Sequence, residues 1–87
     1  MITATSNPMV KELRSLKNKK SRRETGLFVA EGEKCVREAL MYAKVRYVVA
    51  TERYAEGWDD AEVVLVSERI MEAVSEAKNP QGVLAVV

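Results

Sequence analysis

The stretch Lys17–Lys34, KNKKSRRETGLFVAEGEK, changes character twice and sets the pattern for the rest of the chain. Residues 19–25 contain no apolar side chain, which predicts a mobile loop, and Gly26 can take the positive φ of the turn that ends it. The apolar run Leu27–Ala30 has no polar alternation and predicts a short strand covered on both faces. Acidic residues on either side of Gly32 then open a helical pattern, where they complement the helix dipole. This order would hold a cationic segment against a rigid sheet and present its charge to a fixed partner.

A first helix is predicted to begin at Pro8, with Asn7 as its N-cap. Its apolar side chains recur with helical spacing and predict a stripe that faces the core: Met9, Val10, Leu13 and Leu16. Lys11 and Arg14 lie on a different face of this helix, in the direction of the cationic run.

The remaining chain alternates strand and helix patterns. Apolar runs predict further strands at residues 45–50, 63–66 and 83–87. Helical periods predict one helix after Gly32 and another after the cap Ser67, the latter reaching Ala77 before the break at residues 79–82. The alternation predicts an α/β fold, a three-layer α/β/α sandwich with a four-stranded mixed or mostly parallel sheet.

Two local predictions concern residues 51–60. Thr51 is expected to cap a short helical turn that Gly57 ends. Trp58, in a turn over residues 57–60, is expected to fold back on the edge of the domain; an exposed stacking surface for a base is the alternative.

The net charge of +1 conceals an uneven distribution. Residues 1–24 hold seven Lys and Arg against two acidic residues, a net charge of +5, whereas residues 25–87 hold seven against eleven, a net charge of −4. Such asymmetry is typical of a domain that touches nucleic acid with one end. The alternative is a solvated loop that its charge merely keeps soluble.

Composition excludes several kinds of site. The chain has no histidine, and Cys35 is its single cysteine, so neither a zinc site nor an internal disulfide is predicted. No phosphate-cradling glycine loop, dinucleotide motif or nucleophile with an adjacent base is present. No signal sequence or apolar run of about 20 residues is found, so we expect a soluble protein of the cytoplasm.

Four short motifs in order carry a resemblance to a known family. They are Ser6-Asn7-Pro8 with Val10-Lys11 and Leu13, the basic residues ending in Arg22, Gly26-Leu27-Phe28-Val29 with Glu31-Gly32, and Asn79-Pro80-Gln81-Gly82-Val83-Leu84-Ala85. Together they resemble the amino-terminal substrate-binding domain of SpoU/TrmH-type RNA 2′-O-ribose methyltransferases of the SPOUT class, over essentially all 87 residues. Family members often carry an acidic residue and threonine before Pro-Gln-Gly; this chain departs from that pattern with Ala77-Lys78-Asn79, which adds a cation near the turn.

The resemblance implies a fold like that of ribosomal and kink-turn RNA-binding domains. It also implies that the partner is a structured RNA, with rRNA expected rather than tRNA. It also implies a catalytic domain after residue 87, which would bind S-adenosylmethionine and form a homodimer. The apolar ending Leu84–Val87 independently suggests that the chain continues in a longer protein. The 87 residues alone are then expected to be monomeric and inactive, with no cofactor, metal or catalytic residue of their own.

Candidate RNA contacts follow from the charge pattern. Arg22 and Arg23 rank first because a guanidinium can bind phosphate with two hydrogen bonds and stack on bases. The other predicted contacts are point charges or lie on the first helix: Lys17, Lys19, Lys20, Lys11 and Arg14. Glu31, Gly32 and Gln81 are further candidates: for Glu31 and Gly32 a structural role in the turn is equally expected, and for Gln81 the structural role is favoured.

Two other functions stay open from the sequence. One is a stand-alone kink-turn or ribosomal-type RNA-binding protein with no enzyme attached. The other is a protein-interaction module whose cationic run docks on an acidic surface.

Overall fold

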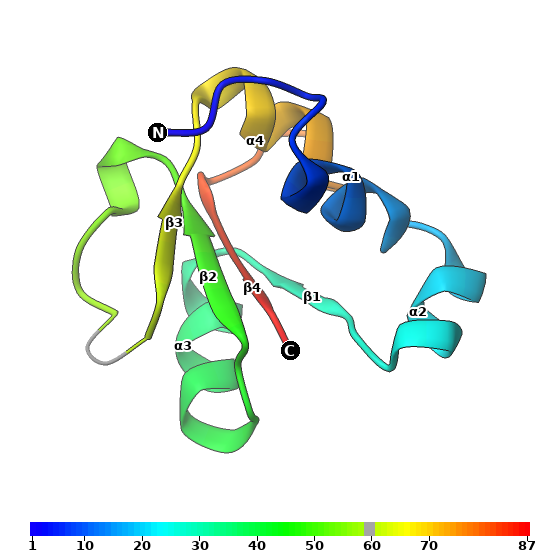
Figure 1. The fold of residues 1–87 in the computed structure, drawn as a ribbon. Coiled ribbons are helices and arrows are strands. Elements are labelled where there is room, and N and C mark those ends of the chain that lie inside the picture. Colours follow the sequence, from blue (N-terminus) through cyan, green and yellow to red (C-terminus); the bar gives the residue numbers. More distant parts are fainter. Residues whose placement is uncertain (59–60) are drawn as a thin grey trace.

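A computed structural model describes residues 1–58 and 61–87; Asp59 and Asp60, which belong to the turn predicted over residues 57–60, lie outside the described residues. The elements in chain order are α1 (Pro8–Ser15), α2 (Lys19–Thr25), β1 (Val29–Glu31), α3 (Glu33–Tyr42), β2 (Tyr47–Ala50), the 3₁₀ helix η1 (Glu52–Tyr54), β3 (Val63–Leu65), α4 (Glu68–Val74) and β4 (Val83–Val86) (Figure 1). None of the helices in this described part has the length and apolar character required to cross a bilayer.

The four strands form one mixed sheet in the order β1-β4-β2-β3. Strand β4 is last in the sequence but central in the sheet, antiparallel to β1 on one side and to β2 on the other. Strands β2 and β3 are parallel, with Val49 opposite Val64. The predicted α/β fold with a mixed sheet is therefore confirmed.

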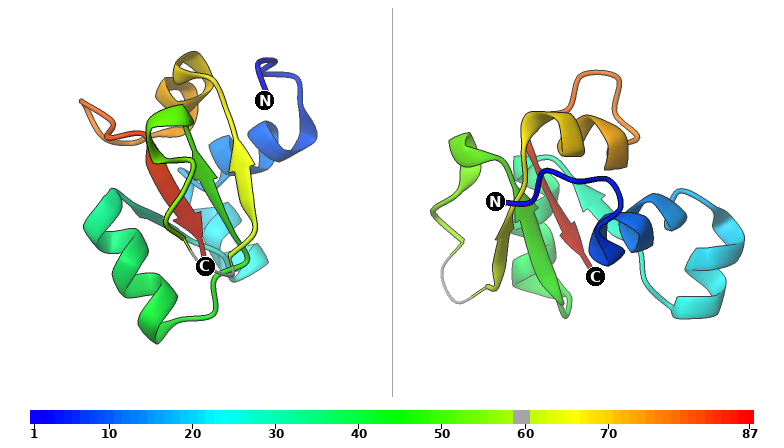
Figure 2. Two further views of the ribbon diagram at one scale, coloured as in Figure 1. Left: turned by 90° about the vertical axis from the view of Figure 1, so that its left-hand side faces the viewer. Right: turned by 45° about the horizontal axis from the view of Figure 1, so that its top comes forward.

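Helices cover both faces of the sheet, as a three-layer sandwich requires (Figure 2). Side chains alternate along β4: Leu84 and Val86 join the cluster under α1 and α4, while Val83 and Ala85 join the cluster under α3. All four are buried, which explains why β4 has no polar residue.

Helix starts follow the predicted caps. The Met9 N–H donates to Asn7 Oδ1 at 2.9 Å, and the Ile70 N–H donates to Ser67 Oγ at 3.2 Å. Helix α4 ends at Val74, short of the predicted Ala77, because the Ser75 backbone turns extended and its hydroxyl accepts the Ala77 N–H.

The helical turn η1 follows Thr51 as predicted, but the expected side-chain cap is wrong. The Thr51 hydroxyl donates to the Gly82 carbonyl at 3.2 Å, so it ties η1 to the residue that precedes β4.

Trp58 folds back as predicted and is only 3% exposed. Its indole N–H donates to the Tyr54 carbonyl at 2.6 Å, and the Arg37 guanidinium lies 4.7 Å from the ring centroid. The alternative of an exposed base-stacking surface at Trp58 is wrong.

Two predictions for the stretch Lys17–Lys34 are wrong. Residues 19–25 form helix α2 rather than a mobile loop, because their caps and helix-favouring side chains suffice without an apolar stripe. The strand after them begins at Val29 and lies at the sheet edge, so it is only half-buried. Phe28, expected inside a covered strand, is 50% exposed.

Candidate nucleic-acid interface

The cationic residues 19–23 lie on the short helix α2, which is capped at both ends. Asn18 Oδ1 accepts the Lys20 N–H at 2.8 Å, and Gly26 closes the helix with φ 72° and an N–H donated to the Arg22 carbonyl at 2.9 Å. No residue of α2 is buried, so the helix projects from the side of the domain (Figure 2).

Five of the seven predicted cationic contacts are exposed side chains on the consecutive helices α1 and α2: Lys11, Arg14, Lys19, Lys20 and Arg23. Lys20 has a 4.0 Å ion pair with Glu24, in which both side chains are exposed, and such pairs contribute little. These cations are available to neutralise the charge of a partner.

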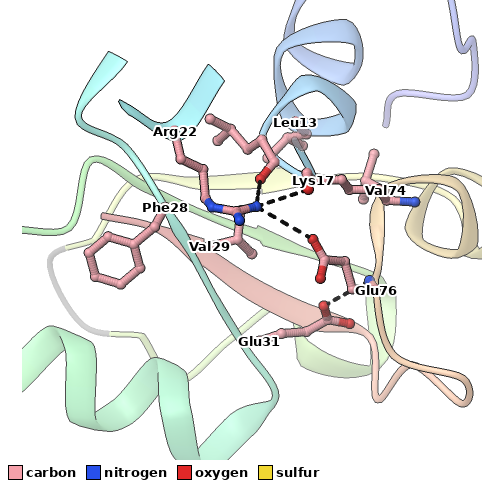
Figure 3. A pocket seen from close by; sticks show the side chains of 9 residues that line it. Leu13, Lys17, Arg22, Phe28, Val29, Glu31, Val74 and Glu76 are labelled. Atoms are coloured by element: carbon pink, nitrogen blue, oxygen red, sulfur yellow. Dashed lines mark hydrogen bonds and ion pairs between the residues drawn. The ribbon is translucent and has the colours of Figure 1, made fainter. Parts of the chain in front are cut away.

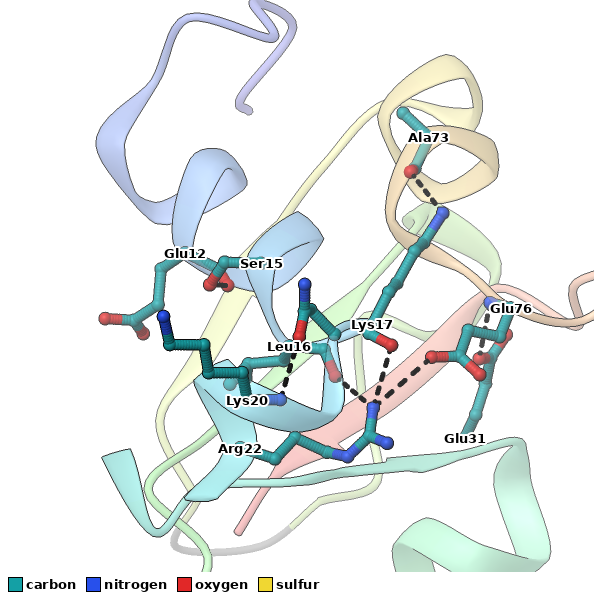
Figure 4. A network of polar contacts seen from close by, with 10 residues as sticks. Glu12, Ser15, Leu16, Lys17, Lys20, Arg22, Glu31, Ala73 and Glu76 are labelled. Carbon is teal, nitrogen blue, oxygen red and sulfur yellow. Dashed lines mark hydrogen bonds and ion pairs between the residues drawn. The ribbon is translucent and has the colours of Figure 1, made fainter. Parts of the chain in front are cut away.

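Arg22 behaves differently from its neighbour Arg23. Its Nη1 donates to the carbonyls of Leu16 at 2.7 Å and Lys17 at 2.9 Å, at the carboxyl end of α1, and lies 4.0 Å from Glu76 Oε1 (Figure 4). A cation at this end of a helix complements the helix dipole. The expectation that Arg22 stands free in a loop is wrong, because its guanidinium holds α2 against α1.

Lys17 also makes an internal contact. Its Nζ donates to the Ala73 carbonyl at 2.9 Å, in the last turn of α4 (Figure 4). Lys17 and Arg22 together therefore link α1 and α2 to the last turn of α4 and to Glu76 in the segment after it. Their binding to RNA stays a prediction.

A cavity of about 350 Å³ lies between α1, α2, β1 and the end of α4 (Figure 3). Its walls combine apolar and charged side chains: Leu13, Leu16, Lys17, Arg22, Phe28, Val29, Glu31, Val74 and Glu76. Within it, the Glu31 carboxylate accepts hydrogen bonds from the Ser75 hydroxyl and, at 3.2 Å, from the Glu76 N–H. Sequence reasoning missed Glu76, because nothing in the pattern brings it beside Arg22.

Gly32 and Gln81 meet at the start of α3. Gln81 Oε1 accepts the Glu33 N–H at 2.8 Å, which gives α3 a side-chain cap from 48 residues away. Gly32 has φ 96°, and a Cβ there would lie 2.9 Å from the same Gln81 oxygen. The three candidates Glu31, Gly32 and Gln81 thus all have structural roles, and their contact with RNA stays a prediction.

Tyr47 joins strand β2 to helix α1. Its hydroxyl donates to Glu12 Oε1 at 3.1 Å. Burial, together with the negative charge of Glu12, raises the pKa of Tyr47 far above its ordinary value, so the phenol keeps its proton at any physiological pH.

Among residues 1–58 and 61–87, no group of three or more carboxylate or thiol side chains is arranged to hold a metal ion. The arrangement at this end of the molecule is therefore one of exposed cations beside a charged cavity. It suits the binding of a polyanion.

Comparison with known proteins identifies the family of this domain. A family model described as the MRM3-like substrate binding domain matches residues 7–85. No curated protein sequence matches the chain.

Three solved structures show the same fold. An rRNA methyltransferase from Sinorhizobium meliloti has a TM-score of 0.82 and 33% sequence identity over 98% of this chain. A putative RNA methyltransferase of the TrmH family from Porphyromonas gingivalis has a TM-score of 0.77 and 34% sequence identity over 99% of this chain. An RNA 2′-O ribose methyltransferase has a TM-score of 0.78 and 28% identity over 98% of this chain. The chain spans 35%, 35% and 36% of these three proteins, respectively. The chain therefore belongs to the MRM3-like substrate binding domain family, in agreement with its resemblance to the substrate-binding domains of SpoU/TrmH-type RNA methyltransferases.

Proposed function

We propose that this chain is the RNA-binding domain of an S-adenosylmethionine-dependent RNA 2′-O-ribose methyltransferase, with rRNA as the substrate. The catalytic domain would follow Val87 in a longer, homodimeric cytoplasmic protein, and the 87 residues alone would be monomeric and inactive. The proteins with the same fold are named as RNA or rRNA methyltransferases, and this chain spans about a third of each.

The observation that carries the proposal is the set of five exposed cations on α1 and α2. Structured RNA is bound mainly through phosphates, 2′-hydroxyls and unstacked bases, because its deep major groove is inaccessible to side chains. Lysines would act as point charges on phosphates, whereas Arg23 can form two parallel hydrogen bonds to one phosphate. The domain would hold the RNA and deliver one nucleotide to the catalytic domain.

Within residues 1–58 and 61–87, the glycines do not form a loop of the kind that could hold S-adenosylmethionine. The four glycines stand in four separate turns, at residues 26, 32, 57 and 82, rather than together in a loop that could approach a cofactor. In the proposal, the methyl donor binds to the catalytic domain.

The first test is a titration of amide resonances with a structured rRNA hairpin at several salt concentrations. Shifts should cluster on α1 and α2. If four or five of the exposed cations each neutralise a phosphate, log affinity should fall with log salt with a slope of roughly −3 to −4.5. A slope near zero would contradict the proposal, and equal competition by an acidic protein would favour a protein-interaction module.

Charge-reversed variants locate the surface. The triple variant Lys19→Glu, Lys20→Glu, Arg23→Glu should abolish measurable binding. The matched control Lys34→Glu, Lys44→Glu, Arg69→Glu makes the same charge change at exposed positions outside α1 and α2 and should reduce binding much less. An equal loss in both variants would show that only net charge matters.

The enzymatic part of the proposal has a separate test. The reading frame past Val87 in the parent gene should encode a further domain, of roughly 150 residues by ordinary domain size. A stop codon soon after Val87 would favour a stand-alone RNA-binding protein instead.

A further inference from the structure

The cavity beside α2 has the size and the wall chemistry of a small ligand site. Its volume of about 350 Å³ falls within the range of roughly 300–1,000 Å³ that is typical of such sites. Leu13, Val29 and Val74 supply apolar walls, while Arg22 and Glu76 point into it from opposite sides (Figure 3).

Arg22 enters the cavity with a fixed orientation and free donors. All three of its contacts within residues 1–58 and 61–87 are made by Nη1, two of them to backbone carbonyls. Its Nε and Nη2 groups have no hydrogen-bond acceptor in that part of the chain. A guanidinium held in this way offers its remaining pair of parallel N–H donors without losing further side-chain entropy.

Glu76 keeps acceptor capacity beside these donors. Its Oε1 lies 4.0 Å from Arg22 Nη1, which is too long for a hydrogen bond, and the Glu76 side chain is 63% exposed. Glu31, the other carboxylate in the cavity, is already occupied by the Ser75 hydroxyl and the Glu76 N–H. The cavity therefore presents two fixed donors next to one free carboxylate.

We propose that this cavity receives one unstacked base of the bound RNA, and that Arg22 and Glu76 read a base edge with two adjacent acceptors followed by a donor. Cytosine offers O2, N3 and its N4 amino group; guanine offers N7, O6 and N1–H. Adenine and uracil carry a donor between two acceptors and do not match. This inference rests on the proposed function, since the phosphates beside the base would be held by the cations of α1 and α2.

The test uses four single-stranded RNA nonamers with eight uridines and one central base, which is C, G, A or U. Their affinities for the 87-residue chain are measured at low salt by fluorescence anisotropy. The C or G oligonucleotide, or both, should bind at least about fivefold more tightly than the A and U oligonucleotides, the low end of discrimination by one bidentate contact. A G preference should disappear with 7-deazaguanine, which lacks N7.

Matched variants show whether the cavity is responsible. Glu76→Gln removes the carboxylate and should bring the four affinities within about twofold of each other, whereas Glu72→Gln makes the same charge change on α4 outside the cavity and should leave the preference intact. A preference that survives Glu76→Gln, or equal binding of all four oligonucleotides, would overturn the base pocket but leave RNA binding in place. If none of the four oligonucleotides showed salt-dependent binding, the base pocket would be overturned, and the hairpin titration would show whether the proposed function fails with it.

Discussion

Helix α2 and strand β4 differ as much as two elements of one small domain can. No residue of α2 is buried, and its helix depends on local features: the Asn18 cap, the Gly26 turn and helix-favouring side chains. Every residue of β4 is buried, and its backbone pairs with β1 and with β2. The fold thus depends on β4, while α2 carries charge.

This separation allows the charged surface to vary without unfolding the domain. Exposed substitutions usually change stability by less than about 0.5 kcal/mol, whereas truncation of buried side chains costs several times more. Stability and RNA binding should therefore respond to different mutations. The four predictions below test how complete the separation is.

The largest expected effect is on β4. Leu84 is fully buried between the α1 and α4 cluster and its neighbouring strands, so Leu84→Ala should reduce the free energy of unfolding by about 2–5 kcal/mol. Arg23→Ala in α2 should change it by less than about 0.5 kcal/mol. Urea unfolding followed by circular dichroism measures both; similar losses in the two variants would contradict the separation.

The glycines next to the two elements give the second comparison. Gly82, which leads into β4, has φ 115°, and a Cβ there would lie 2.6 Å from Thr51 Oγ1. Gly26, which ends α2, has φ 72° and open space around it. Gly82→Ala combines backbone strain with a steric clash and should cost more than about 2 kcal/mol, whereas Gly26→Ala should cost about 1 kcal/mol through strain alone.

The same urea experiment decides this comparison. Equal costs for the two alanine variants would mean that Thr51 moves aside without loss, although its hydroxyl donates to the Gly82 carbonyl. In that case the tie between η1 and β4 would be weaker than its geometry indicates.

The difference between α2 and β4 also explains which features the sequence predicts. Apolar runs and the Asn7 and Ser67 caps act locally and predict the strands and two helix starts. Helix α2 was not predicted because its residues show no apolar periodicity. Its caps, Asn18 and Gly26, can nevertheless be identified in the sequence. A helix without an apolar face has to be recognised from its ends.

Contacts between distant residues could not be predicted. The Gln81 cap on α3 and the approach of Glu76 to Arg22 depend on the insertion of β4 between β1 and β2. For the same reason, the charge pattern located the cationic surface but could not separate Arg22, which is bonded to the end of α1, from the exposed Arg23.

Arg22 and Arg23 therefore give the third comparison. Arg22→Ala removes two hydrogen bonds to backbone carbonyls and should reduce stability by about 1 kcal/mol, because the side chain is only half-buried. Arg23→Ala should leave stability unchanged but lower the magnitude of the salt slope for RNA binding by roughly 0.7–0.9, the value for one lost phosphate contact. Thermal unfolding and RNA binding are measured on both variants. If Arg22→Ala left the thermal stability unchanged, the assignment of a structural role to Arg22 and a binding role to Arg23 would be refuted.

The smallest expected effect on the whole domain is that of the α2 cap. Asn18→Ala removes the acceptor for the Lys20 N–H, a change worth about 1 kcal/mol to a helix. Because the first turn of α2 buries no residue, it can fray while Arg22 still holds the helix against α1, and this loss should appear locally: α2 amides should exchange hydrogen about fivefold faster, while β4 amides are unaffected. Asn79→Ala, at an exposed position that caps no helix, is the control and should alter neither set. Faster exchange throughout β4 in the Asn18 variant would mean that α2 unfolds together with the core, and that the helix which carries the charge also contributes to the stability of the sheet.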